Sequence, residues 1–252
     1  SDVYKRQDYK EMAEGDGHIK TGSVRRLIAG EPIGVFYGYR FDGIFQNEEE
    51  CKQQTSSASP IGVGLRRYKD LNGDGKVDAA NDREILGDAN PKFFGGLTNT
   101  FAYKGFELNV FLQYSYGNKI LNYNAMELEN PTGGQNAYAD MVNRWTPENP
   151  SNIYPKATTN RAILASDRFI EDGSYLKLKT LSLSYSFPKI NMKHIQGLRL
   201  YVTGQNLLTW TKYRGYDPEV SYRGASTLEA GEDFGGYPQS RTFMFGVKLD
   251  IK

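Results

Sequence analysis

The sequence predicts an all-β protein, an antiparallel transmembrane β-barrel with long extracellular loops. Three observations lead to this fold class. Long segments alternate between apolar and polar residues, aromatic residues gather at the ends of these segments, and short connections alternate with long ones. Soluble sandwich strands usually stop after about five or six residues, whereas strands that cross a membrane are longer.

The first expected strand, residues 35–41, is the weakest, with Val35, Tyr37, Tyr39 and Phe41 on one face. The clearest strand covers residues 106–116. Its apolar face is formed by Phe106, Leu108, Val110, Leu112, Tyr114 and Tyr116, and its polar face by Glu107, Asn109, Gln113 and Ser115. Successive side chains of a strand point to opposite faces, so this alternation indicates a strand between two different media. About eleven residues, tilted by about 40°, cover roughly 28 Å, close to the ~25 Å apolar band of an outer-membrane barrel.

Three further strands are expected in residues 174–187, 197–205 and 243–251. Their apolar faces are Leu181, Leu183, Tyr185 and Phe187; Leu198, Leu200 and Val202; and Phe243, Phe245, Val247, Leu249 and Ile251. Aromatic residues near the strand ends, such as Tyr114, Tyr185 and Trp210, are typical of interfacial girdles. Asn206 has the parity of the apolar face, which requires either a bulge or a position above the membrane.

The connections give a separate test. Only Lys104 and Gly105 separate two strands, more than fifty residues follow Tyr116, a middling link PKINMKHIQG comes next, and a long connection ends near Arg241. Outer-membrane barrels place short turns in the periplasm and long loops outside the cell. The alternation therefore agrees with a barrel.

Composition excludes several classes of protein. The 31 basic and 30 acidic residues nearly cancel, which predicts no nucleic-acid partner. The single cysteine, Cys51, excludes an internal disulfide. The sequence contains no run of eighteen apolar residues, so no transmembrane helix is predicted. The polar start of the chain suggests that it is a piece of a longer protein.

Several motifs, in order, resemble the SusC/RagA-type TonB-dependent outer-membrane transporters: GYRFDGIFQNEEE, the segment from YKDLNGDGKVDAAND to LQYSYGNKILN, RWTPENP, GSYLKLKTLSLSYSFP and LYVTGQNLLTWTKYRGYDPEVS. The resemblance implies that residues 1–252 are the C-terminal portion of such a barrel, about its last eight strands, and an open sheet when taken alone. It also implies uptake of oligosaccharides or peptides across the outer membrane of a Gram-negative bacterium. The implied partners are a SusD-like lid lipoprotein, the TonB complex and outer-membrane lipid.

The loop DLNGDGKVDAAND follows the spacing of an EF-hand calcium loop. Its candidate donors are Asp70, Asn72, Asp74, the backbone carbonyl of Lys76, Asp78 and Asp82. Asn81 stands where the bidentate glutamate is required, and no helices flank the loop, so a calcium sensor is excluded. Two hypotheses remain: Ca²⁺ or Mg²⁺ rigidifies an extracellular loop, or Asx and glycine turns hold it without an ion.

Residues with the parity of the barrel lumen are candidates for contact with substrate. They are Glu107, Asn109, Gln113, Arg199, Tyr201 and Gln205. Lys177 and Lys179 share the parity of the apolar face of their strand, which predicts that they lie at the outer surface and bind lipid phosphate or extend into water.

Two other classes of protein stay open. A soluble β-rich carbohydrate-binding or glycosidase domain would use a pair of carboxylates among Glu107, Asp217, Glu219 and Asp233. Solvated turns are the simpler explanation for most of these residues. A structural or adhesive barrel would lack the coupling to TonB. The main interpretation, a transporter, predicts that the protein is not an enzyme.

Overall fold

The computed structural model describes residues 24–130, 136–159, 163–188, 195–220, 222 and 230–251, and the backbone of residues 18–20. The chain divides into two compact units. Unit 1 comprises Ser1–Asn90, Lys119–Glu171 and Val220–Gly236, and unit 2 comprises Pro91–Asn118, Asp172–Glu219 and Tyr237–Lys252.

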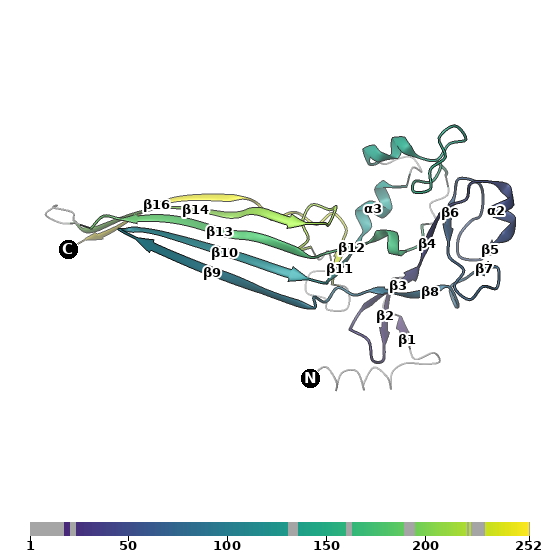
Figure 1. Ribbon diagram of the computed structural model, residues 1–252, viewed down its shortest axis with the longest axis horizontal. Helices are drawn as coiled ribbons and strands as arrows, with labels where there is room; N and C mark the ends of the chain where they lie inside the picture. Colours follow the sequence, from purple (N-terminus) through teal and green to yellow (C-terminus); the bar gives the residue numbers. More distant parts are fainter. Residues whose placement is uncertain are drawn as a thin grey trace. The chain divides into compact units, whose positions relative to one another are not determined.

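Unit 2 is one five-stranded antiparallel sheet with the order β16-β14-β13-β10-β9 (Figure 1). Its strands are β9 (Phe93–Tyr103), β10 (Phe106–Tyr116), β13 (Tyr175–Ser186), β14 (Ile195–Thr211) and β16 (Thr242–Ile251). They contain 10 to 17 residues each, long enough for the predicted membrane strands. The sheet is open, as expected for a fragment of a barrel, but five long strands are described where the family resemblance implied about eight.

The pairing register gives this sheet one apolar and one polar face. Leu108 pairs with Phe101 and Leu183, and Leu183 pairs in turn with Val202. Val202 pairs with Phe245, whose side chain is 82% exposed. Aromatic residues of this apolar face gather at both strand ends: Phe93, Tyr116 and Trp210 at one end, and Tyr103, Phe106 and Tyr185 at the other. The predicted alternation is confirmed, and aromatic residues lie at both strand ends as expected, while their place at a membrane interface stays a prediction.

The two ends of the sheet differ in their connections. At one end, here called the hairpin end, β9 and β10 are joined by Lys104 and Gly105 alone. Their φ values of 46° and 87° fit a type I′ turn, whose twist matches that of paired strands. The opposite end, the loop end, lies at Phe93, Tyr116 and Tyr175. The segments of unit 1 leave the sheet at the loop end, so the predicted alternation of short and long connections is confirmed.

Two bulges interrupt the register. Between β10 and β13, Phe111 pairs with Thr180 but Leu112 pairs with Leu178, so Lys179 is an extra residue. Between β13 and β14, Gln205 pairs with Thr180 and Leu208 with Leu178. Asn206, in this second irregularity, has a φ of 52° and donates from Nδ2 to the carbonyl of Ser240 at 3.0 Å. The bulge that the parity of Asn206 required is therefore present.

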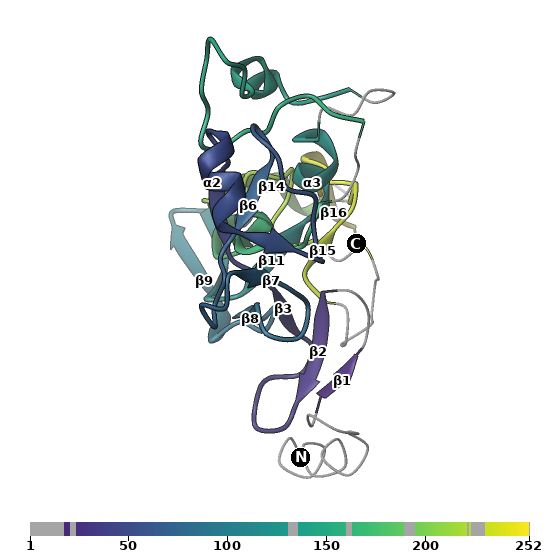
Figure 2. The ribbon, with the colours of Figure 1, turned by 90° about the vertical axis from the view of Figure 1, so that its right-hand side faces the viewer.

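Unit 1 has shorter elements. They are β1 (His18–Lys20), β2 (Arg25–Ile28), β3 (Val35–Tyr39), β4 (Phe41–Ile44), α2 (Glu48–Gln53), β5 (Thr55–Ser56), β6 (Arg66–Tyr68), β7 (Lys76–Val77), β8 (Arg83–Gly87), β11 (Lys119–Asn122), α3 (Tyr123–Leu128), η1 (Ala139–Asn143), η2 (Asp167–Phe169), β12 (Ile170–Asp172) and β15 (Glu232–Asp233). Figure 2 shows β1, β2 and β3, which belong to a four-stranded sheet with β8. Among the described residues, no helix is both long and apolar enough to cross a membrane.

The core of unit 1 corrects the prediction for residues 35–41. Val35 and Phe36 are adjacent in β3, so they point to opposite faces, yet both are fully buried. Phe36 packs with Leu121 and Phe169 from the other segments of the unit. A new strand, β4, begins at Phe41. This segment is therefore a buried strand of unit 1 and not a wall strand with one solvent-facing side, because Phe36 places an apolar side chain on its second face.

The hairpin turn yields a prediction about stability. A Cβ atom at Gly105 would lie 2.7 Å from the carbonyl oxygen of Ser186, at a φ that L-residues avoid. We expect Gly105→Ala to lower the free energy of unfolding by about 1–2 kcal/mol. Lys104→Gly relieves a positive φ and is the matched control, expected to be neutral or stabilising. Urea unfolding of the full-length protein in detergent measures both; equal losses would contradict the type I′ assignment.

Candidate functional site

The polar face of the sheet brings together the residues predicted to line a lumen. Through the register, Glu107 shares a row with Ser184 and Tyr201, and Gln113 shares a row with Lys177. All six predicted residues lie on this face: Glu107, Asn109, Gln113, Arg199, Tyr201 and Gln205. Their contact with a substrate stays a prediction.

Toward the hairpin end, the polar face carries hydrogen bonds between strands. Arg199 donates from Nη2 to Glu107 Oε1 at 2.6 Å and to Ser184 Oγ at 2.7 Å. The hydroxyl groups of Ser182 and Thr203 lie 2.7 Å apart. The Arg199 and Glu107 side chains are 39% and 43% exposed, so this ion pair offers charge and hydrogen bonds to a hydrated space.

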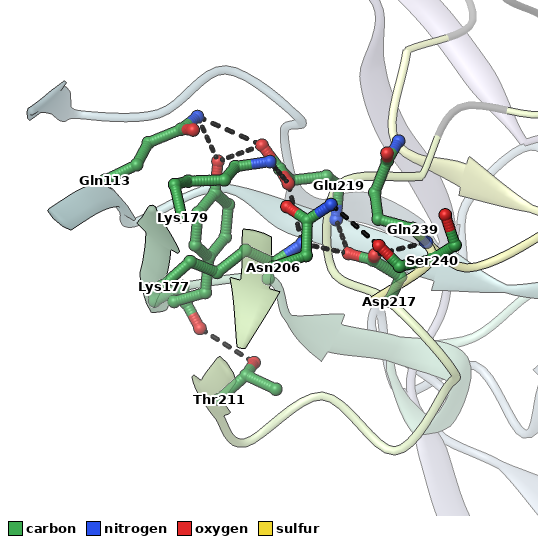
Figure 3. Close-up of polar contacts among 12 residues, drawn as sticks. Gln113, Lys177, Lys179, Asn206, Thr211, Asp217, Glu219, Gln239 and Ser240 are labelled. Carbon is green, nitrogen blue, oxygen red and sulfur yellow. Dashed lines mark hydrogen bonds and ion pairs between the residues drawn. The ribbon is translucent and has the colours of Figure 1, made fainter. Parts of the chain in front are cut away.

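Toward the loop end, the same face holds a buried charge network, here called the Lys177 cluster. Its members are Gln113, Tyr175, Lys177, Lys179, Asp217 and Glu219 (Figure 3). The Lys177 side chain is only 2% exposed, and its Nζ lies 2.5 Å from Asp217 Oδ1 and 2.6 Å from Glu219 Oε2. Lys179 Nζ lies 2.6 Å from the same Glu219 oxygen. Two cations and two carboxylates thus balance in one place.

Neutral groups complete the hydrogen bonding of Glu219. Its Oε1 accepts from the Tyr175 hydroxyl at 3.0 Å and from Gln113 Nε2 at 3.0 Å. Because Gln113 and Lys177 are paired on the polar face, the segment that carries Glu219 covers that face. The loop after β14 therefore folds onto the polar wall and not away from it.

The two carboxyl groups of the loop, those of Asp217 and Glu219, have pKa values below their ordinary values. Burial raises the pKa of Asp217, but hydrogen bonds from Lys177 and from the amides of Glu219 and Gln239 outweigh it and lower the pKa. Burial likewise raises the pKa of Glu219, and hydrogen bonds from Lys177 and Lys179 lower it further than burial raises it. A depressed carboxyl pKa stabilises the folded form above the unfolded pKa, and this stability is lost as pH falls through the folded pKa. Asp217 and Glu219 are therefore held as carboxylates at neutral pH.

The Lys177 cluster corrects two predictions. Lys177 lies on the polar face and not on the lipid side, because the extra residue Lys179 reverses the parity of β13 on passing the bulge. Lys179 also points to Glu219, so the prediction that these lysines bind lipid phosphate is wrong. Asp217, expected in a solvated turn, is only 6% exposed. The one sequence signal for the cluster was a pair of lysines with the parity of the apolar residues of their strand, followed later in the chain by the acidic segment GYDPEVS.

In the acidic loop of unit 1, the aspartate side chains accept hydrogen bonds from backbone amides of the same loop. Asp70 accepts from the amides of Gly73 at 2.7 Å and Gly75 at 2.6 Å. Asp74 Oδ1 accepts from the amide of Lys76 at 2.8 Å, and Asn72 donates to Asp74 Oδ2 at 2.9 Å.

Asp82, one residue beyond the expected twelfth position, is fully buried. It accepts from the amides of Leu71 at 2.8 Å and Asp78 at 2.7 Å. A hydrogen bond from the amide of Asn81 is the largest factor that lowers the pKa of Asp78. Within the described residues, no three acidic, histidine or cysteine side chains are arranged to hold a metal ion. These contacts are those expected of the turn hypothesis, and the ion itself stays a prediction.

Comparison with known proteins shows that the chain is similar in sequence to TonB-dependent receptors. No family model matches it. It is 39% identical over 239 residues to TonB-dependent receptor P3 of Formosa agariphila, covering 92% of this chain and 24% of that receptor. It is 28% identical over 192 residues to TonB-dependent receptor SusC of Bacteroides thetaiotaomicron, covering 73% of this chain and 17% of SusC. The chain is a relative of the SusC-type TonB-dependent receptors.

Solved structures agree with this relationship. The structure of the RagAB peptide transporter matches 92% of the present chain, with a TM-score of 0.70 and 24% sequence identity. The structure of the RagAB peptide importer in the 'open-open' state matches with a TM-score of 0.69. At this identity the likeness establishes the fold. The names of the matched proteins are those of receptors and importers rather than enzymes, in agreement with the prediction. The chain spans 24% of the length of its first curated relatives.

The Lys177 cluster yields a prediction about the loop after β14. Lys177→Met removes the main cation beside the buried Asp217 and the partly buried Glu219, and breaking a buried pair in this way costs about 3–5 kcal/mol. We expect faster hydrogen exchange in residues 212–219 of the full-length protein in detergent. Lys248→Met is the control, because that lysine is 69% exposed and lies 3.8 Å from Asp250. Identical exchange in both variants would contradict a structural role for the cluster.

The acidic loop yields a prediction that separates the two hypotheses. Because Asp82 accepts two backbone amides, Asp82→Ala should increase proteolysis of residues 70–82 in calcium and in chelator alike. Asp74→Ala tests the ion, because Asp74 is exposed and is a candidate donor. Protection by calcium in the parent protein, lost in Asp74→Ala, would establish the ion site; identical cleavage with calcium and chelator would leave only the turns.

Proposed function

We propose that the chain supplies wall strands and extracellular loops to a TonB-dependent transporter, which takes up nutrients across the outer membrane of a Gram-negative bacterium. The observation that carries this proposal is the two-faced sheet of unit 2. Its apolar face exposes Leu97, Phe101 and Phe245 at 54%, 61% and 82%, while its polar face carries ion pairs. A soluble protein rarely exposes so continuous an apolar surface, but lipid covers such a surface in a barrel.

We assign residues 1–252 to the C-terminal portion of the barrel, with the plug and the TonB-contacting segment in other parts of the protein. The loop end of the sheet then faces the outside of the cell, and the segments of unit 1 form extracellular loops. A SusD-like lipoprotein is the proposed partner at this surface. The aromatic residues at both strand ends would lie at the lipid headgroups, with lipopolysaccharide on the outer side.

Peptides or oligosaccharides are the proposed cargo. The likeness to RagAB, which is named a peptide importer, supports peptides. The polar wall suits either class, since Arg199 and Glu107 offer a cation and an anion, and Tyr201, 42% exposed, offers an aromatic ring. In a closed barrel the loop held by Lys177 would lie inside the lumen and narrow its outer part.

The alternative of a soluble glycosidase gains no support from its carboxylates. Glu107 is paired with Arg199, and Asp217 and Glu219 are paired with Lys177. Asp233 is fully buried and accepts from the amide of Gly236. Each carboxylate is engaged in a structural contact, so none is placed as a general acid or base.

Adjacent residues in β13 test the membrane orientation. Leu183 lies on the apolar face and Ser182 on the polar face, and they are neighbours toward the hairpin end, with Leu183 two residues from Tyr185. An arginine that faces lipid costs about 2–4 kcal/mol at the bilayer midplane and about 0–1 kcal/mol near the interfaces, so Leu183→Arg should lower the free energy of unfolding in lipid by about 1–3 kcal/mol. Ser182→Arg should fold normally and alter uptake. The change in mobility on an SDS gel between unheated and heated samples measures assembly of the barrel, and an uptake assay measures transport. If Leu183→Arg assembles normally, the membrane assignment is wrong.

A further inference from the structure

Unit 1 contains a cavity of about 340 Å³ that the transport proposal does not use. It is lined by Tyr123, Glu127, Tyr222, Glu232 and Phe234. Tyr123 is the first residue of helix α3, and Phe234 directly follows β15. A volume of this size falls at the lower end of the range of small-molecule sites, about 300–1,000 Å³.

Three aromatic rings form the walls of the cavity. The centroids of Tyr123 and Phe234 lie 6.0 Å apart with the ring planes at 89°, and those of Tyr222 and Phe234 lie 5.4 Å apart at 74°. Tyr222 and Phe234 are 55% and 47% exposed. They lie outside the long strands of the sheet, so the lipid that covers the apolar face does not account for this exposure.

The two charged residues that the structure describes in the lining of the cavity are both acidic. Glu232 is buried, and its Oε1 lies 3.1 Å from Arg25 Nε. The Arg25 guanidinium is itself held 3.9 Å from the Phe36 ring and donates to the carbonyl of Gly34. Arg25 therefore makes its contacts inside the unit and is not among the residues that line the cavity. Glu127 also lines the cavity and is exposed, so a ligand would meet aromatic rings together with a carboxylate.

We propose that this cavity binds a compact organic cation, the ammonium group of a lysine side chain or the guanidinium group of an arginine side chain in a peptide. The negative faces of aromatic rings attract a cation within about 6 Å of the ring centroid, and a carboxylate in the lining adds to this attraction. A sugar ring is a poorer match, because it stacks on a broad flat platform. The rings here are nearly perpendicular and form a corner.

Saturation-transfer NMR on the full-length protein in detergent tests this site directly. The probe is N-acetyl-lysine amide, and the control ligand is N-acetyl-norleucine amide, which keeps the chain but lacks the charge. We expect saturation of the lysine ε-methylene protons and none for norleucine. Equal signals from both ligands, or binding of glucose alone, would overturn the proposal. The assay requires neither TonB nor transport, so its outcome is independent of the transport proposal.

Variants locate the binding. Tyr222→Leu and Glu127→Gln should each weaken lysine binding by roughly 3- to 30-fold, through loss of a ring face or of the carboxylate charge. Glu49→Gln is the matched control, because Glu49 is likewise an exposed glutamate of a short helix, α2, and does not line the cavity. Glu127→Gln leaves the rings intact and guards against a folding defect in Tyr222→Leu. Unchanged affinity in both cavity variants would refute the site.

Discussion

The sheet of unit 2 depends on one constraint: every backbone group of its strands must be paired while its two faces meet different media. Antiparallel pairing satisfies the amides and carbonyls between neighbouring strands. The strict alternation of side chains then lets one set of residues suit hydrocarbon and the other suit water. Long strands, a tight hairpin at one end and aromatic residues at both ends follow from this requirement.

Bulges adjust that constraint locally. Lys179 and Asn206 interrupt the alternation in neighbouring strands, and the interruption moves Lys177 from the apolar side to the polar side. Without the extra residue, an ammonium group would face hydrocarbon at considerable cost. With it, the charge lies between Asp217 and Glu219 and binds a loop to the wall. The change of register in β13 thus allows this strand to form an ion-paired contact with the loop after β14.

Unit 1 shows the opposite organisation. Its segments are separated in the chain by strands of unit 2, and they share a buried core. Phe36 comes from the first segment, Leu121 and Phe169 come from the second, and the three meet in one buried cluster. The ion pair of Arg25 with Glu232 joins residues 207 positions apart. The aromatic cavity exists because α3 and the turn after β15 are brought together in the same way.

The sequence by itself determined the long strands, their apolar and polar faces, the two-residue hairpin and the alternation of short and long connections. These features depend on local periodicity and on turn chemistry, which neighbouring residues specify. The tertiary structure alone decided that Val35 and Phe36 bury both faces of β3, that Lys177 lies on the polar face, and that Asp217 and Glu219 hold it there. Strand register and loop position depend on partners that are distant along the chain. An extra residue in one strand reverses parity, and only the pairing between strands reveals where it lies.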